Sequence, residues 1–409
     1  MTTITLNKPF TSNFSTRPLK SSRIESIDLL RGIVMIVMAL DHVRHVFHHE
    51  AYSYDPLDLT RTSVPIFFTR WITHYCAPIF VFLAGISVYL HGVNKTRAEL
   101  ANYLFKRGLW LVVVEIFIIS LGNTFNPTYP IINLQVIWAI GISMIALSAI
   151  IYLRRELILT IAIFLIAGHN LLDNVHVPGS GWTSFIWATL HDPVDFVFGR
   201  FLIVVKYPVL PWIGILSIGY YLGYLFSSHY DPEKRMKVLI LLGFISMELF
   251  FLLRTVNNFG DSGNWSNQES AVFSLLSYLN VTKYPPSLLY TLITIGPAMV
   301  FLALADKPLN SFTKRIVVFG RVPFFYYVVH IYMIHLLAMF AAILSGFGWK
   351  SMILTNKINL VPGLRGFGFN LLTVYLVWIM LIIIMYPLCK WYGRYKRNNM
   401  SGQNWLSYV

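Results

Sequence analysis

About ten long apolar segments run through this chain of 409 residues, and they restrict its fold more than any other feature. A helix needs about 20 consecutive apolar residues to cross the hydrocarbon core of a bilayer, and most of these segments approach that length. We therefore predict an all-α fold, a polytopic helical bundle of about ten transmembrane helices. Their predicted positions are residues 29–48, 70–91, 108–123, 132–152, 157–172, 208–227, 237–254, 286–305, 321–345 and 368–389.

The composition agrees with a membrane protein. Hydrophobic residues make up 56% of the chain and charged residues 12%, and the mean hydropathy is +0.61. Soluble domains contain about 25% charged residues. The net charge of +14 is explained by basic loops on the cytoplasmic side of a membrane, and no RNA- or DNA-binding motif is present. We expect a lipid bilayer, and no nucleic acid, among the partners.

The distribution of Lys and Arg predicts how the helices are oriented. If the N-terminus is cytoplasmic, roughly two thirds of these residues fall on the cytoplasmic side, as the positive-inside rule requires. We therefore predict an integral, multi-pass protein of the plasma (inner) membrane with both termini in the cytoplasm. The predicted parts are a tail at 1–25, one membrane domain at 26–390 and a second tail at 391–409.

A dense polar cluster lies in the first apolar segment. Asp41, Arg44, His45 and His48 follow the helical spacing that places side chains on one face, and His42 lies about 100° away from Asp41. Ionised groups inside a bilayer are costly, so they mark functional sites by default. A carboxylate beside an imidazole suits a general base or a nucleophilic histidine. The alternative is a structural network of ion pairs at the end of a helix.

Two later segments add candidates for the same site. His74 opens the second apolar segment, where Pro78 can kink the helix toward a cavity and Gly85 permits close packing. In the ninth segment, His330 and its neighbour Tyr327 are expected near the middle of the membrane. Each histidine has a simpler interpretation, a capping or interfacial role for His74 and an ordinary polar contact in the bundle for His330. Glu115 and Glu248 are expected to face the interior of the bundle.

Basic residues at the cytoplasmic ends of several segments could bind a polyanion. Asp28 and Arg31 form an i, i+3 pair there, and Lys106, Arg107 and Arg321 are predicted at the same level. Guanidinium groups pair well with phosphates such as those of coenzyme A. The alternative is an N-terminal cap beside an arginine that extends to the interface.

A metal site is not expected. The run that contains His42, His45, His48 and His49 has a spacing that permits two ligands from one helix. No HExxH or CxxC pattern accompanies it.

Taken together, these residues resemble the heparan-α-glucosaminide N-acetyltransferase-like family and its bacterial branch of ten-helix membrane proteins. The matching stretches are residues 26–32, 41–44, 76–87 and 319–330, and residues 386–391 and 405–408 look like the bacterial branch in particular. The resemblance covers nearly the whole chain. It departs from the lysosomal branch at 41–45, where that branch has a glycine-rich stretch after the first helix.

The resemblance implies an activity. Acetyl-CoA or another acyl-CoA binds from the cytosol, and the acyl group is delivered to an extracytoplasmic glycan or small-molecule acceptor. In this interpretation His42, oriented by Asp41, is the base or transient acyl carrier, and His74 and His330 line the reaction path. Asp28, Arg31, Arg107 and Arg321 hold the donor, while Arg44, His45 and Tyr327 contact the acceptor.

A different class of protein uses similar residues. A proton-coupled transporter or permease would use the Asp41–His42–Arg44 cluster as a proton relay. No internal repeat of the kind found in many transporters is visible in the sequence. The sequence alone does not identify the acceptor, the acyl chain or the oligomeric state, for which a homo-oligomer is one alternative.

Overall fold

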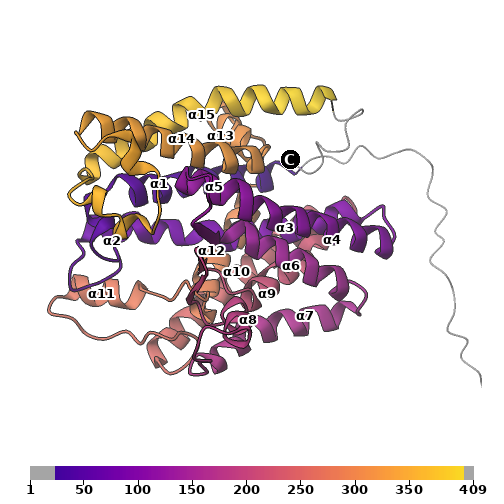
Figure 1. The fold of residues 1–409 in the computed structure, drawn as a ribbon. Coiled ribbons are helices and arrows are strands. Elements are labelled where there is room, and N and C mark those ends of the chain that lie inside the picture. The colour runs from indigo at the N-terminus through magenta and orange to yellow at the C-terminus, as the bar shows by residue number, and fades with distance from the viewer. Residues whose placement is uncertain (1–23, 400–409) are drawn as a thin grey trace, which may run out of the picture.

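The structure is a computed structural model, and it describes residues 24–399. Long helices run side by side along one common direction, and the start of α1 and the end of α15 lie at the same end of the bundle (Figure 1). Most of the predicted tail 1–25, the end of the tail 391–409 and the motif at 405–408 lie outside the described residues.

Each predicted apolar segment corresponds to a helix or to a run of joined helices. The single helices are α1 (Glu25–Phe47), α6 (Val136–Ile150), α10 (Pro232–Val256), α12 (Leu288–Leu304), α14 (Pro323–Leu344) and α15 (Leu371–Asn399). The joined runs are α2 (Val64–Trp71), η2 (Ile72–Tyr75) and α3 (Cys76–Gly92); α4 (Arg97–Val113), η3 (Val114–Ile119) and α5 (Ser120–Thr124); α7 (Arg155–Ile163), η4 (Phe164–Gly168) and η5 (His169–Leu172); α9 (Leu210–Leu222) and η6 (Gly223–Phe226).

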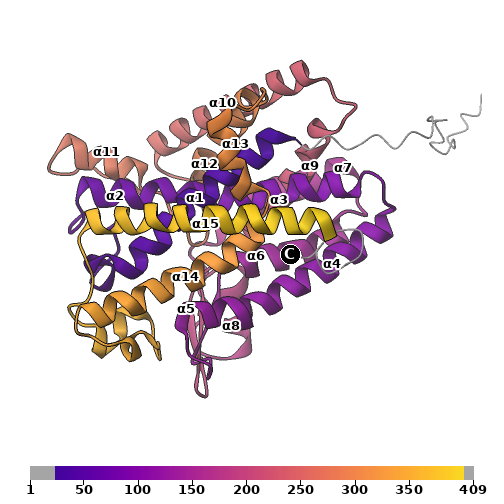
Figure 2. The same ribbon diagram turned by 90° about the horizontal axis from the view of Figure 1, so that it is seen from above.

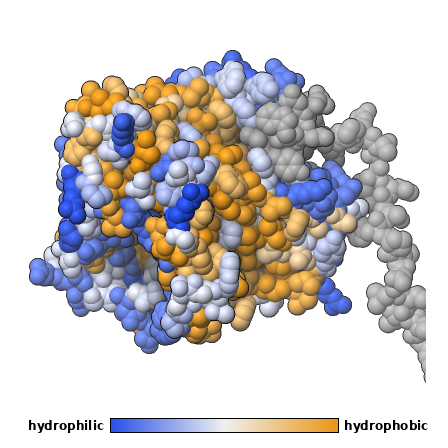
Figure 3. Space-filling view, in the orientation of Figure 1, coloured by the Kyte–Doolittle hydropathy of each residue, from blue (hydrophilic) through white to orange (hydrophobic). Residues whose placement is uncertain are grey.

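Five of these runs are long and apolar enough to cross a membrane, namely Val64–Gly92, Arg155–Leu172, Pro232–Val256, Pro323–Leu344 and Leu371–Asn399. Three more apolar helices are shorter, Val136–Ile150, Leu210–Phe226 and Leu288–Leu304. A broad apolar surface covers the middle of the molecule, and hydrophilic residues gather toward its two ends (Figure 3). The chain is thus a helical membrane protein, while the number of ten spans stays a prediction.

Polar residues extend several helices beyond the apolar stretches that predicted them. α4 begins at Arg97 because Thr96 and Glu99 form a capping box, in which each side chain binds the backbone of the other residue. The second run begins at Val64 and not near residue 70, so Arg70 lies inside a helix. Hydropathy detects only the part of a helix that is apolar, which explains both differences.

A small sheet was not part of the all-α prediction. Its strands are β1 (Ile131–Leu134), β2 (Asp195–Phe198) and β3 (Phe201–Val205), in the order β1-β3-β2. β1 pairs with β3 in parallel, and β2 and β3 form an antiparallel hairpin. Gly199 adopts a φ of 58° in the two-residue turn, a conformation that favours glycine. β2 and β3 form within a segment that was predicted to be a connection, whereas β1 takes the place of the first residues of the helix predicted at 132–152, which begins only at Val136. Strands this short leave little signal in the sequence.

The other connections contain short helices. η1 (His49–Tyr52) lies between α1 and α2, and α8 (Trp182–Leu190) lies between η5 and β2. α11 (Ala271–Leu279) lies between α10 and α12. α13 (Ser311–Gly320) joins α12 to α14, and η7 (Trp349–Met352), η8 (Ile358–Leu360) and η9 (Pro362–Leu364) precede α15. Figure 2, seen from above, shows α15 crossing the bundle over α1 and α3.

The two intramembrane glutamates have different environments. Glu115 is fully buried, and its Oε2 accepts a hydrogen bond of 3.0 Å from the backbone N–H of Trp138, in the first turn of α6. This carboxylate therefore satisfies a helix N-terminus inside the bundle. The prediction for Glu248 is wrong, since this residue lies on the exposed face of α10. Glu248 faces outward because of the way α10 is rotated about its own axis. The sequence around Glu248 does not reveal that rotation.

Glycines bring helix backbones into direct contact. A Cβ atom on Gly320 would lie 1.9 Å from the carbonyl oxygen of Asp28, and Gly32 meets α13 in the same contact between α1 and α13. A Cβ atom on Gly85 would lie 2.1 Å from the carbonyl oxygen of Leu216 in α9. Small residues at such positions let membrane helices pack closely. The expected role of Gly85 in close packing agrees with this geometry.

Replacing Gly320 with Ala is expected to lower the midpoint of thermal unfolding in detergent. The added methyl group must push α1 away from α13, and overpacking of this kind costs about 1–3 kcal/mol. Gly393→Ala is the matched control, because its Cβ would lie 3.6 Å from the nearest atom, a side-chain carbon of Val322. Equal unfolding midpoints for the two variants would contradict this account.

Candidate active site

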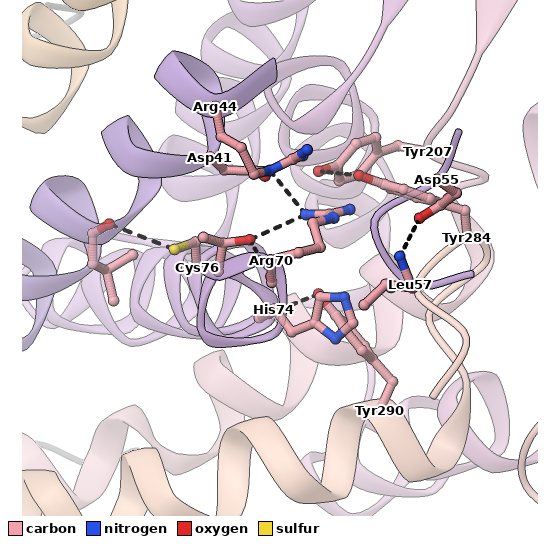
Figure 4. A network of polar contacts seen from close by, with 12 residues as sticks. Asp41, Arg44, Asp55, Leu57, Arg70, His74, Cys76, Tyr207, Tyr284 and Tyr290 are labelled. Atoms are coloured by element: carbon pink, nitrogen blue, oxygen red, sulfur yellow. Dashed lines mark hydrogen bonds and ion pairs between the residues drawn. The ribbon is translucent and has the colours of Figure 1, made fainter. Parts of the chain in front are cut away.

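A carboxylate held by two guanidinium groups forms the centre of the polar cluster. Oδ1 of Asp41 accepts a hydrogen bond of 3.0 Å from Arg44, one turn further along α1. Oδ2 accepts a bond of 2.8 Å from Arg70 in α2, which also donates to the hydroxyl of Thr73 at 3.1 Å. Both arginines are buried, and Figure 4 shows them converging on the carboxylate. Charge pairing makes the burial of these groups tolerable and joins α1 to α2.

The imidazole of His42 is oriented by a second histidine. Nδ1 of His42 lies 2.8 Å from Nε2 of His330 in α14, and the two rings stack with centroids 5.0 Å apart. Nδ1 of His330 lies 2.9 Å from the backbone carbonyl oxygen of Tyr326. The partner that the structure gives the His42 ring is therefore His330, while the carboxylate of Asp41 binds arginines.

This chain of contacts assigns the protons on both rings. A carbonyl oxygen only accepts, so Nδ1 of His330 carries the hydrogen in their contact. In a neutral ring, Nε2 of His330 then has a lone pair and must accept from Nδ1–H of His42. Nε2 of His42 consequently keeps its own lone pair. His42 is partly exposed and lines a cavity, so this basic nitrogen is available for chemistry.

Three cavities follow one another through the bundle and share wall residues. The inner cavity, of about 470 Å³, begins beside Arg31 and reaches Phe80 and Tyr327. The middle cavity, of about 40 Å³, has Phe80 and Tyr327 in its wall together with Asp41 and His42. The outer cavity, of about 440 Å³, shares Asp41 and His42 with the middle one. His42 and Tyr327 therefore lie where the inner and outer cavities approach each other through the middle one.

Tyr327 is buried between the inner and middle cavities. Its ring meets that of His42 edge-on at 6.3 Å and that of His330 at 5.6 Å. Its hydroxyl is buried without a hydrogen-bond partner among the described residues. A buried hydroxyl that lines a cavity and lacks a partner is suited to bind a substrate atom.

Cations line one end of the inner cavity. Arg31, Arg107 and Lys396 come from α1, α4 and α15, and Tyr103 and His91 add polar groups beside them. The rest of the wall is mostly apolar, with residues such as Leu111, Ile137 and Ile140. His42 follows Arg31 by eleven positions on α1, or roughly 16 Å along the helix axis. The cavity thus joins a basic end to an apolar passage that leads toward His42.

Asp28 and Arg321 lie close to Arg31 but do not line the inner cavity. Arg31 donates to the hydroxyl of Ser87 at 2.8 Å and lies 3.4 Å from both a carboxylate oxygen of Asp28 and the carbonyl oxygen of Gly320. Arg321 contacts Asp28 from the other side, at 3.8 Å. Of the four predicted donor-binding residues, Arg31 and Arg107 line the cavity, whereas Asp28 and Arg321 support Arg31.

The remaining predicted residues divide between the cavity walls and the core. Arg44 and His45 line the outer cavity. His74 is buried beside Tyr290, whose hydroxyl donates to the His74 carbonyl oxygen at 2.7 Å (Figure 4). The structure places His74 next to the cluster but not among the residues that line the three cavities.

Two tyrosines and two lysines that the sequence analysis did not single out complete the site. Tyr207 and Tyr284 meet at the cavity wall, with hydroxyl oxygens 3.5 Å apart. The ammonium groups of Lys206 and Lys283 lie 5.2 Å and 5.3 Å from the centre of the Tyr284 ring. Both pairs belong to a repeated Lys-Tyr-Pro tripeptide, at 206–208 and 283–285. This repeat was the available signal, while Arg70 could have been found as a charge inside an apolar run.

The surroundings of Tyr284, which lies in a connection outside the membrane-spanning helices, favour its phenolate. Burial acts to raise the pKa of Tyr284, but the positive charges of the two lysines and of Arg70 outweigh burial and lower the pKa to about 7. Its hydroxyl therefore changes charge close to neutral pH.

One tyrosine is expected to ionise near pH 7 in an ultraviolet titration of the purified protein, well below the ordinary pKa of 10.0. Because the pKa is lower in the folded state, the phenolate stabilises the fold most above pH 10, and this contribution is lost as the pH falls through about 7. Tyr284→Phe should abolish the early phase, whereas Tyr152→Phe, at an exposed position, should keep it. A single titration near pH 10 in the wild type would refute the assignment.

Comparison with known proteins connects this geometry to a family. The model of the family described as "Heparan-alpha-glucosaminide N-acetyltransferase, catalytic" matches residues 23–254, more than half of the chain. A search of curated proteins finds no match. The matched region contains Asp41, His42 and Arg70, and it ends before Lys283 and His330. The chain belongs to the heparan-alpha-glucosaminide N-acetyltransferase catalytic-domain family of membrane proteins.

Proposed function

We propose that this protein is a membrane-embedded acyltransferase that moves an acetyl or other acyl group from cytosolic acyl-CoA to an extracytoplasmic glycan or similar acceptor. The observation that carries this proposal is the series of three cavities, which share walls at His42 and Tyr327. Such a series offers a donor and an acceptor separate places on the two sides of one catalytic group. Membership of an acetyltransferase family supports the same reaction class.

The inner cavity suits coenzyme A by its chemistry. Arg31, Arg107 and Lys396 supply positive charge at one end, where the phosphates of the donor would bind. The apolar wall beyond them suits an uncharged arm that carries the thioester toward Tyr327. The start of α1 and the end of α15 lie at this end of the bundle. We infer that this end faces the cytoplasm and that the protein is embedded in the inner membrane.

His42 is the group that transfers the acyl unit or activates the acceptor. As an acyl carrier, Nε2 would attack the thioester carbonyl carbon, the C–S bond would break, and the CoA thiolate would leave. The acceptor amine or hydroxyl would then attack the acyl carbon, and the C–N bond to His42 would break and free the ring. As a base, Nε2 would take the proton from the acceptor amine or hydroxyl while the acceptor attacks the thioester carbonyl carbon, and the C–S bond would break to release the CoA thiolate. In either case His330 stabilises the positive charge that develops on the His42 ring through the bond at Nδ1. Asp41 adds a negative charge close to the ring.

The outer cavity suits a polar acceptor. Its wall presents amide and hydroxyl groups from Asn123, Thr124, Gln135 and Asn356, together with His45. These groups can donate to and accept from the hydroxyl groups of a sugar. The cations Arg44, Arg70 and Lys206 line the same cavity beside Asp41.

Replacing His42 with Ala is expected to reduce acyl transfer about 100-fold or more, since general acid–base groups contribute about 10²–10⁴-fold. The assay would follow CoA release from acetyl-CoA in proteoliposomes with a panel of amino-sugar oligosaccharides outside. His49→Ala is the control, because His49 is exposed and lies close by on η1. Full activity in His42→Ala would refute the assignment.

His330 is expected to act as a positioning residue. His330→Gln should keep more activity than His330→Ala, because an amide oxygen can still accept from Nδ1–H of His42. The pH profile of kcat should shift in both variants, which a purely structural role would not produce.

Proton-coupled uptake in the same vesicles without CoA would support the transporter instead.

Binding of the donor is expected to raise the thermal unfolding midpoint of the detergent-purified protein, because a ligand stabilises the state to which it binds. Coenzyme A and acetyl-CoA should each give a saturable shift, reduced in Arg31→Ala and Arg107→Ala. Arg315→Ala is the control, since Arg315 is an exposed cation on α13 that does not line the inner cavity. The absence of a shift at millimolar ligand in folded protein would contradict a CoA donor.

A further inference from the structure

A second cluster of chemically reactive side chains lies apart from the His42 site, between the end of the α7 run and the end of α8 (Figure 1). His169 opens η5, Asp173 directly follows it, and His191 directly follows α8. Each of the three offers one ligand atom, and these atoms lie within 4.8 Å of one another. Both histidines are 2% exposed. None of the three residues lines the cavities described above.

The carboxylate of Asp173 is held in one orientation. The side-chain amide of Asn170 donates to Oδ2 of Asp173 at 2.9 Å, and its oxygen accepts from the backbone N–H of Leu288 at 3.0 Å. Oδ1 of Asp173 is thereby directed toward Nε2 of His191. Bonds of this kind, which orient a ligand from behind, are typical of metal sites.

The spacing of the ligand atoms fits a shared metal ion as well as a long hydrogen bond between Asp173 and His191. Oδ1 of Asp173 and Nε2 of His191 are 3.3 Å apart, longer than the usual hydrogen bond of about 2.9 Å. Two ligands of a tetrahedral zinc ion, each at about 2.0–2.1 Å, lie about 3.3 Å from each other.

His169 supplies an independent observation. Neither of its ring nitrogens has a hydrogen-bond partner of normal geometry within the described residues, although the Pro286 backbone lies near enough to influence the ring. The ring lies 5.4 Å from that of His191, centre to centre. It also directly follows η4, a π-helical turn, and such turns occur frequently at functional sites. A buried imidazole with a nitrogen within 4.8 Å of two other ligand atoms, and with only a marginal contact to the Pro286 backbone besides, is placed to bind an ion.

We propose that His169, Asp173 and His191 bind a divalent transition-metal ion, zinc foremost, with the remaining coordination position filled by water. Two imidazole nitrogens and one carboxylate oxygen form a donor set that zinc accepts. The sequence analysis expected no metal, and it examined only the histidines near His42. The spacing of 169, 173 and 191 matches no common motif, so only the fold brings these residues together.

The metal has a structural role next to the outer cavity. Thr189, two residues before His191, accepts a hydrogen bond of 2.8 Å from the backbone N–H of Val209, just before α9. Lys206 and Tyr207, which line the outer cavity, lie between β3 and α9. An ion that joins the end of the α7 run to the end of α8 would therefore hold this wall in place. The proposal does not depend on the reaction assigned to His42.

The test is the metal content of tag-free protein, purified in detergent from cells grown with added zinc. Elemental analysis by mass spectrometry is expected to find about one zinc per chain, and His191→Ala and Asp173→Asn should lose it. His176→Ala is the matched control, since His176 lies in the same region and pairs with Asp192 at 2.9 Å in an exposed position. Zinc at the level of the buffer blank in the wild type, or equal zinc in all variants, would overturn the proposal.

A second measurement uses only the wild-type chain, so it does not depend on whether the variants fold. Cobalt added to metal-free protein should produce the intense visible absorption of a tetrahedral site, and zinc should displace it. Zinc should also raise the unfolding midpoint, and a chelator should reverse this change. Cobalt that shows only the weak spectrum of the free hydrated ion, with no change in unfolding, would refute the site.

Discussion

The carboxylate of Asp41, buried among apolar helices and held by Arg44 and Arg70, is the interaction on which the rest of the site depends. A lone charge in this environment is unfavourable, whereas two guanidinium groups compensate it and each comes from a different helical run. The network therefore fixes α1 against α2. That contact determines where His42, the next residue on α1, points. Removal of one partner would leave the others charged and buried, so the three residues act as a unit.

The arrangement of the three cavities is consistent with the proposed transfer of a group past His42. The inner and outer cavities have similar volumes but different walls: the inner wall is basic at one end and otherwise mostly apolar, whereas the outer wall mixes apolar side chains with many polar and charged ones. Between them the passage narrows to about 40 Å³ beside His42 and Tyr327. In the proposed reaction, this narrow centre would admit the small transferred group and keep the two larger substrates apart.

The outer connections do more than join helices. They form the sheet, α8 and the Lys-Tyr-Pro turns, and from these come Lys206, Tyr207, Lys283 and Tyr284 at the wall of the site. Positive charge gathered around Tyr284 lowers its pKa, because two lysines from separate connections and Arg70 converge on one ring. The His169 cluster lies in the same region. Its proposed metal would join the end of the α7 run to the end of α8 and so stabilise this wall, as a disulfide or a buried ion pair does in other folds.

The sequence by itself determined the membrane helices and the polar cluster on α1, because hydropathy and helical spacing are local properties of the chain. It also pointed to Arg31 and Arg107, which line the basic end of the inner cavity. Only the tertiary structure decided that His330, 288 residues away, is the partner of His42, and that Arg70 shares Asp41. It also placed His74 against Tyr290 and turned Glu248 outward. These contacts depend on how helices pack and rotate against each other, and no short stretch of sequence contains that information.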